Sequence, residues 1–203
     1  MRNLLSLSFI TAMIIAAPLA AQDGQFRFGS QLSFLNPSGD LSDVSKSGFG
    51  LALQFERAWT EKMATRARIE YLAFGTKDLT DKDLVEFMEV KAKATVYGIS
   101  GDWLYSFNSF NQGAFFFAGP GFYNAKIEDS GYIDYSIIGG GVLEGSDSRN
   151  KTCFAVLAGV GFNFNRNLGA EVKYTKTFGL KFYDEDEKSV KWDWIQLSAS
   201  YRF

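Results

Sequence analysis

Histidine does not occur in this chain of 203 residues, and cysteine occurs once. Without histidine, the protein lacks the usual general base, the commonest zinc and copper ligand and every nucleophilic triad that uses an imidazole. A single cysteine excludes an internal disulfide framework and every metal site built from several thiolates. We therefore expect no enzymatic activity, no metal site and no cofactor.

An excess of basic residues is also missing. The chain has 21 Lys and Arg against 23 Asp and Glu, so its net charge of −2 gives no electrostatic basis for binding nucleic acid. Proline is scarce at three residues, whereas there are 20 glycines and aromatic residues make up 16% of the chain. This composition is unusual for a soluble enzyme and typical of an antiparallel barrel, and the length supports one domain.

The first residues have the pattern of an export signal. Arg2 supplies a positive charge, residues 4–15 are almost entirely apolar, and Pro18 precedes small residues that end at Ala21. The sequence therefore predicts a signal peptide over 1–21 and a barrel domain over 22–203. The alternative, an uncleaved membrane anchor, is disfavoured by the marginal apolar length and by Pro18.

The rest of the chain alternates with a period of two. In residues 49–56, for example, apolar side chains occupy the odd positions and small or polar side chains occupy the even positions. Because successive side chains of a strand point to opposite faces, each such segment has one apolar and one polar surface. The pattern predicts eight strands, over 25–34, 49–58, 65–74, 95–105, 114–127, 152–162, 168–175 and 192–203.

The strand and connection lengths favour a membrane barrel. Strands of ~10–11 residues tilted by ~45° cross an apolar band of ~25 Å. The connections alternate between long (36–47, 76–91, 128–151 and 179–191) and short (59–64, 106–113 and 163–167). This rhythm is typical of an up-and-down barrel with short periplasmic turns. We predict an all-β, eight-stranded antiparallel transmembrane β-barrel.

The choice between a membrane barrel and a soluble barrel also decides which face of the strands points inward. A membrane barrel turns its apolar face toward lipid, whereas a soluble barrel, the alternative, turns it inward. A polar face rich in glycine suits a narrow lumen. Aromatic residues near the strand ends are expected to form the interfacial girdles: Tyr71, Trp103, Tyr105, Tyr123, Tyr201 and Phe203.

The last strand, 195–203, alternates apolar and polar residues and ends at Phe203. With the glycine-rich segments 119–123 and 159–162, it resembles the small eight-stranded outer-membrane barrels of the OmpA-like, OmpX-like and OmpW-like group. The resemblance implies an outer-membrane location, contact with membrane lipids and lipopolysaccharide, and assembly by the barrel-assembly machinery. It also implies that Tyr201 and Phe203 belong to the signal that this machinery reads.

The inward face is predicted to carry four acids and five bases, which we expect to form ion pairs. The simplest interpretation is a packed plug, since the lumen of eight strands is about filled by its own side chains; a gate in a narrow solute path is the alternative. Glu56 is expected to face Arg66, so that its removal would expose Arg66 and Arg68 to each other. The predicted network comprises Arg27, Glu56, Arg66, Arg68, Glu70, Asp102, Glu171, Lys173 and Arg202.

Pro120 falls within a predicted strand, where it removes a ladder hydrogen bond, and it is flanked by Gly119 and Gly121. We expect a bulge or kink that helps a small barrel to curve. A lateral opening toward lipid, as the resemblance to OmpW-like proteins suggests, is the alternative. Cys153 is interpreted as a small packed residue at the start of a strand.

The long connections are acidic, with 16 Asp and Glu against 9 Lys and Arg. The densest acidic run, 184–187, is interpreted as solvated loop, with a calcium site as the alternative. The segment 132–138 is too apolar for an idle loop, so either the flanking strands continue above the membrane or this segment contacts a partner. The loop ligand is not predicted. Overall, the sequence predicts a non-catalytic barrel with a structural or surface-binding role; the alternative is a narrow pore for small or apolar solutes.

Overall fold

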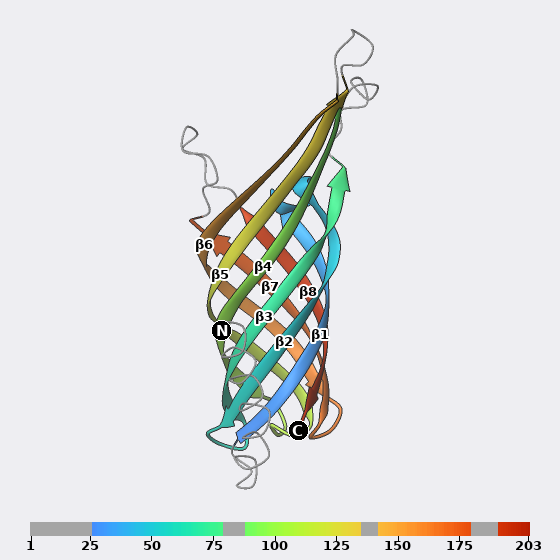
Figure 1. Ribbon diagram of the computed structural model, residues 1–203. Coiled ribbons are helices and arrows are strands. Elements are labelled where there is room, and N and C mark those ends of the chain that lie inside the picture. Colours follow the sequence, from blue (N-terminus) through green and yellow to red (C-terminus); the bar gives the residue numbers. More distant parts are fainter. Residues whose placement is uncertain (1–25, 79–87, 135–141, 180–190) are drawn as a thin grey trace, which may run out of the picture.

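The chain folds into a closed barrel of eight antiparallel strands, as seen in a computed structural model that describes residues 26–78, 88–134, 142–179 and 191–203 (Figure 1). Each strand pairs with the next in sequence, and the first pairs with the last, so the predicted fold is confirmed. The elements are β1 (Phe26–Gly39), α2 (Leu41–Val44), β2 (Ser45–Ala58), β3 (Met63–Asp78), β4 (Met88–Ser106), β5 (Gly113–Asp134), β6 (Val142–Asn163), β7 (Leu168–Phe178) and β8 (Trp192–Arg202).

The alternation in the sequence becomes an alternation of burial along each strand. In β2, Leu51 is 62% exposed on the outside of the barrel, whereas its neighbour Ala52 is 5% exposed on the inside. The same alternation runs through β1, β3, β7 and β8. Large apolar side chains therefore cover the outer wall, which is the arrangement expected for a barrel surrounded by lipid.

The alternation in β5 explains three consecutive phenylalanines. Phe115 and Phe117 point inward and are buried, while Phe116 between them is exposed on the outer wall. On β6, a side chain at Gly159 would collide with the Phe117 ring, and one at Gly161 would collide with the Phe115 ring. The glycines thus provide the space that the two inward rings occupy.

The position of Tyr123 contradicts one prediction. It was expected in an interfacial girdle, but its side chain lies inside the barrel and is fully buried. The inward positions of β5 are the odd-numbered ones, which places Tyr123 on the same face as Phe115 and Phe117. The other five predicted girdle residues, Tyr71, Trp103, Tyr105, Tyr201 and Phe203, are exposed on the outer wall.

Two apolar clusters fill parts of the interior. The outer cluster lies toward the long connections and includes Leu72, Phe74, Tyr123, Trp192 and Trp194. The inner cluster lies toward the short turns and comprises Ala64, Leu104, Phe110, Phe115, Phe117 and Leu157. The inward face is therefore less uniformly polar than the sequence analysis predicted, with charged residues between apolar ones.

Strands β4, β5 and β6 are longer than predicted and project beyond the rest of the barrel at the end opposite the C-terminus (Figure 1). Strands β5 and β6 have 22 residues each, and their pairing continues without a register shift up to Asp134 and Val142. The apolar segment 132–138 therefore begins as a continuation of β5; residues 135–141 lie outside the described part. Most of the connection predicted over 128–151 is strand.

The predicted signal peptide over 1–21 and the acidic run 184–187 lie outside the described residues. Within the described part of the chain, no helix combines the length and the apolar character needed to cross a membrane.

The projecting hairpin should be dispensable for folding. We expect that replacing residues 128–148 by Asn-Gly, with Ile127 and Arg149 kept, leaves a barrel that still migrates differently on a gel before and after boiling. The free energy of unfolding should fall by less than ~2 kcal/mol, because the described parts of the removed segments pair only with each other and with the projecting end of β4, beyond the rest of the barrel. Failure of the shortened chain to fold in detergent would contradict this separation.

Candidate functional site

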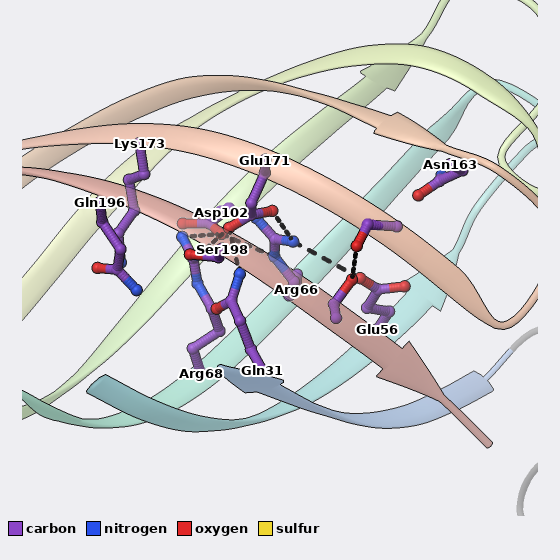
Figure 2. Close-up of polar contacts among 12 residues, drawn as sticks. Gln31, Glu56, Arg66, Arg68, Asp102, Asn163, Glu171, Lys173, Gln196 and Ser198 are labelled. Carbon is purple, nitrogen blue, oxygen red and sulfur yellow. Dashed lines mark hydrogen bonds and ion pairs between the residues drawn. The ribbon is translucent and has the colours of Figure 1, made fainter. Parts of the chain in front are cut away.

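The nine ionisable residues predicted for the lumen all point inward, and none is more than 4% exposed. Strands β1, β2, β3, β4, β7 and β8 supply them, because each strand places every second side chain inside the barrel. Figure 2 shows Glu56, Arg66, Arg68, Asp102 and Glu171 joined by polar contacts across the lumen, with Lys173 to one side of them. These residues are Arg27, Glu56, Arg66, Arg68, Glu70, Asp102, Glu171, Lys173 and Arg202.

The centre of the network consists of two arginines and two carboxylates. Arg66 donates from Nε to Asp102 Oδ2 at 2.9 Å and from Nη1 to Glu171 Oε2 at 2.7 Å. Arg68 Nη2 lies 2.6 Å from the same Asp102 oxygen, and Arg68 Nη1 donates to Glu171 Oε1 at 2.7 Å. Each carboxylate therefore lies between the two guanidinium groups and offsets their mutual repulsion.

Sequence position accounts for part of this geometry. Arg66 and Arg68 are two residues apart on β3 and so share a face, and Asp102 is the cross-strand partner of Arg66 on β4. Glu171 comes from β7, on a strand that does not neighbour β3 or β4. It can reach both arginines because the barrel is closed and narrow.

Glu56 extends the network toward the short turns. It is the cross-strand partner of Arg66, as predicted, with 3.7 Å between Glu56 Oε1 and Arg66 Nη1. Its closer ion pair is with Arg202, whose Nε lies 3.0 Å from Glu56 Oε2. The expectation that Glu56 separates Arg66 from Arg68 is therefore wrong: Asp102 and Glu171 lie between those two arginines, and Glu56 joins Arg66 to Arg202.

Glu70 and Lys173 form the other end of the network. Lys173 Nζ donates to Glu70 Oε1 at 2.5 Å, and the Tyr123 hydroxyl donates to Glu70 Oε2 at the same distance. Trp194 packs edge-on against Tyr123, with ring centroids 5.3 Å apart. The charged network thus meets the outer apolar cluster at Tyr123.

Sequence analysis missed several uncharged members of the network. Gln31 donates to Glu171 at 2.8 Å, Gln196 donates to Ser33 at 2.7 Å, and Ser33 and Ser198 are 2.9 Å apart. All four are on predicted inward positions, so the same alternation that selected the charged residues could have found them. Tyr123 could not be found in this way, because the strand that carries it alternates less cleanly.

Aromatic packing surrounds the central arginines. The Phe117 ring lies 4.6 Å from the guanidinium carbon of Arg66 and 5.2 Å from that of Arg68. A guanidinium over an aromatic face is attracted by the ring quadrupole, and the attraction is strongest where water is excluded. The inner apolar cluster therefore packs directly against the charged centre.

Arg27 is the member that does not join the others. Among the described residues, no carboxylate lies within 4.0 Å of its guanidinium group, although Arg27 is 4% exposed. Its Nη2 donates to Asn111 Oδ1, and its guanidinium carbon lies 4.2 Å from the centre of the Phe110 ring. Eight of the nine predicted residues thus have an oppositely charged partner within 4.0 Å, in one group of six and one separate pair, and Arg27 has none among the described residues.

The remaining predicted positions are on the barrel wall. Around Pro120, four residues are missing from the β4–β5 pairing: Gly101 and Asp102 on β4, and Gly119 and Pro120 on β5. The register of the two strands is the same before and after this gap. A side chain at Gly119 would collide with the Gly101 carbonyl oxygen, so the two strands approach closely there. Neither β4–β5 nor β5–β6 has a register shift at Pro120, so the described strands contain no bulge at this point.

Tyr201 and Phe203 lie on the outer wall at the end of the last strand, with ring centroids 5.2 Å apart in an edge-to-face contact. Cys153 is buried within β6 rather than at its start. In the part of the chain that the structure describes, no group of three or more Asp, Glu or Cys side chains is arranged to hold a metal ion.

The central carboxylates should be essential for stability. We expect Glu171→Gln to lower the free energy of unfolding by about 3–5 kcal/mol, because it leaves the buried Arg66 and Arg68 with one shared carboxylate. Urea unfolding in detergent micelles measures the change. The control is Glu128→Gln, which removes the exposed ion pair with Lys126 and should change nothing measurable. Equal stability of the two variants would contradict the role of the network.

Comparison with known proteins agrees with this geometry. Residues 5–203 match the family model of the outer membrane protein beta-barrel domain. The fold is similar to that of Ail, the attachment invasion locus protein of Yersinia pestis, with a TM-score of 0.56 and 17% identity over 88% of this chain and 98% of that one. A major outer membrane protein from Thermus thermophilus gives a TM-score of 0.50 and 14% identity, over 88% of this chain and 99% of that one.

No curated protein matches the chain. The structural similarities are at low identity and show the fold alone, whereas the family model covers nearly all of the sequence. The alternating strands, the apolar outer wall and the charged interior are what an outer-membrane location requires. The chain therefore belongs to the family of outer-membrane β-barrel proteins.

Proposed function

We propose that this protein is a non-catalytic outer-membrane barrel whose lumen is closed by its own side chains, and which acts through its surfaces. The observation that carries this proposal is the buried network centred on Arg66, Arg68, Asp102 and Glu171. Its four groups span the lumen from β3 and β4 to β7 with contacts of 2.6–2.9 Å. Ions that pass through would have to separate these pairs in a buried site.

The apolar clusters support the same proposal. On one side of the network, Phe117 and Leu157 are buried within the inner cluster; on the other, Trp192 and Trp194 are buried within the outer cluster. An eight-stranded barrel has room inside for little more than its own side chains. A charged layer between two apolar layers is an arrangement that excludes both water and ions.

The projecting part of β4, β5 and β6 supports a role at the cell surface. Lys93 and Lys126 lie on its outer face, beyond the apolar residues Tyr97 and Phe122 that mark the membrane-facing wall. Exposed amines at this height are placed to contact the phosphates of lipopolysaccharide, which we propose as a surface partner. A pocket of about 490 Å³ beside Lys93, lined also by Ser130 and Ser148, adds hydroxyl groups to the same surface.

The route to the membrane belongs to the proposal as well. Residues 1–21 would be removed during export, and the exposed rings of Tyr201 and Phe203 would be read by the barrel-assembly machinery. Their position supports this: Tyr201 lies on the outer wall of β8 and the exposed Phe203 follows its last residue, at the end of the barrel with the short turns, where an assembly factor in the periplasm would meet them.

Single-channel recording in planar bilayers tests the closed lumen. We expect no steady current steps from the wild-type protein. The variant Arg68→Ser, Glu171→Ser, Trp194→Ala should conduct, because it removes side chains from the network and the outer cluster without changing the net charge. Current through this variant shows that the protein is inserted, so silence of the wild type then reports a closed lumen.

Steady openings of the wild-type protein would contradict the proposal and favour the alternative, a narrow pore for small solutes. A matched control is Lys126→Ser, Glu128→Ser, which removes an exposed ion pair of the projecting strands with no change in net charge. It should be as silent as the wild type, because these residues lie outside the lumen.

A further inference from the structure

We propose that the periplasmic mouth of the barrel binds a small oxyanion, a phosphate or a carboxylate, through Arg27. This site lies apart from the central network, and it does not depend on whether the lumen conducts. It rests on three observations: the charges of the interior, the environment of Arg27 and a pocket beside it.

The described interior carries one more base than acid. Lys173 pairs with Glu70, Arg202 pairs with Glu56, and the two central arginines share Asp102 and Glu171. These pairings use all four acids of the network and four of its five bases. The remaining base is Arg27, which is 4% exposed and has no carboxylate within 4.0 Å among the described residues. A buried, uncompensated charge is costly and calls for a counter-charge.

The hydrogen bonds of Arg27 leave capacity for a ligand. Nη2 donates to Asn111 Oδ1, and the Phe110 ring covers the guanidinium plane at 4.2 Å. Nη1 is buried and has no hydrogen-bond partner among the residues that the structure describes. A guanidinium group presents its donors as a planar fork that fits two oxygens of a phosphate or carboxylate. An oxyanion would therefore both accept a hydrogen bond from Nη1 and supply the negative charge that Arg27 lacks.

A pocket of about 500 Å³ lies beside Arg27. Its wall is formed by two short turns, with Thr60 from one and Ser109 and Asn111 from the other. Hydroxyl and amide groups such as these donate to oxyanions. The turns are held together at this place, because the Phe110 amide donates to the Glu61 carbonyl oxygen at 2.8 Å and Asn163 donates to the Phe110 carbonyl oxygen at 3.0 Å.

Charged residues of both signs lie around Arg27. Glu61 is the acid among the residues that line the pocket, and its exposed side chain is turned to solvent. Glu56 has the strongest electrostatic effect on Arg27 and attracts it, while Arg202 and Arg166 repel it, a repulsion that an anion would relieve. Glu56 is already engaged by Arg202 and Arg66.

Binding of inorganic phosphate to the folded full-length protein in detergent tests the site. We expect calorimetry to give a dissociation constant of about 1 mM for the wild type, and phosphate to raise the temperature at which the folded band disappears on a gel. Chloride replaces phosphate at equal ionic strength in the reference samples. Acetate should compete with phosphate, because both present oxygens to the same fork.

Two variants should abolish binding for opposite reasons. Arg27→Gln removes the cation, and Asn111→Asp places a carboxylate of the protein itself against Arg27; each should weaken phosphate binding by about tenfold or more. Asn111→Asp also supplies the missing counter-charge, so it should fold even if Arg27→Gln does not. Lys62→Gln, in an exposed turn at the same mouth, is the matched control and should bind phosphate as the wild type does.

The source of the anion is separated by a second titration. Micelles that contain phosphatidylglycerol present the phosphate as a lipid headgroup, whereas inorganic phosphate enters from water. If the lipid saturates the wild type but not Asn111→Asp, the site binds a headgroup. If inorganic phosphate alone saturates the wild type, the site binds a soluble ligand. The proposal is overturned if the wild type does not respond to phosphate, or if Asn111→Asp binds it as well as Lys62→Gln does.

Discussion

The ion pairs between Arg66, Arg68, Asp102 and Glu171 are the interaction on which the rest of the structure depends. A barrel that turns its apolar side chains toward lipid must place its polar side chains inside, where little water can reach them. Charges in such a place are tolerated only if each has a partner of opposite sign and enough hydrogen bonds. The packing of Phe117 against both arginines and the hydrogen bond from Gln31 to Glu171 complete this requirement.

The fold could be predicted because its strongest signal is local. A period of two needs only neighbouring residues, and it placed the Leu51 side chain outside and the Glu56 side chain inside before any pairing was known. The register of β2 and β3 follows from a short turn, and so the facing of Glu56 and Arg66 was also predictable. The signal weakened at Phe115, Phe116 and Phe117, where all three positions are apolar, and Tyr123 further along the same strand was assigned to the wrong face.

The partners of the charged residues could be predicted only in part, because they come from strands that are distant in sequence. Nothing near Glu171 in the chain indicates that its two oxygens bind Arg66 and Arg68 on the other side of the lumen. The same limit explains why Glu56 was paired with Arg66 alone, when its closer contact is Arg202 at the end of the chain. Strand ends were missed for a different reason: β5 and β6 continue through residues that are polar on both faces, where alternation no longer marks a strand.

The two ends of the barrel differ in the length of their strands and turns, and this difference limits where such a protein can contact other molecules. At one end, strands are joined by turns of a few residues at 59–62 and 164–167, and Phe110 covers the mouth beside Arg27. At the other end, β4, β5 and β6 continue well beyond the apolar wall. A sheet that extends into water gains no stability from lipid, and it offers an exposed surface for the contact with lipopolysaccharide that we propose. In the proposed function the lumen is closed, and the surfaces left for recognition are then this outer sheet and the small polar mouth on the opposite side.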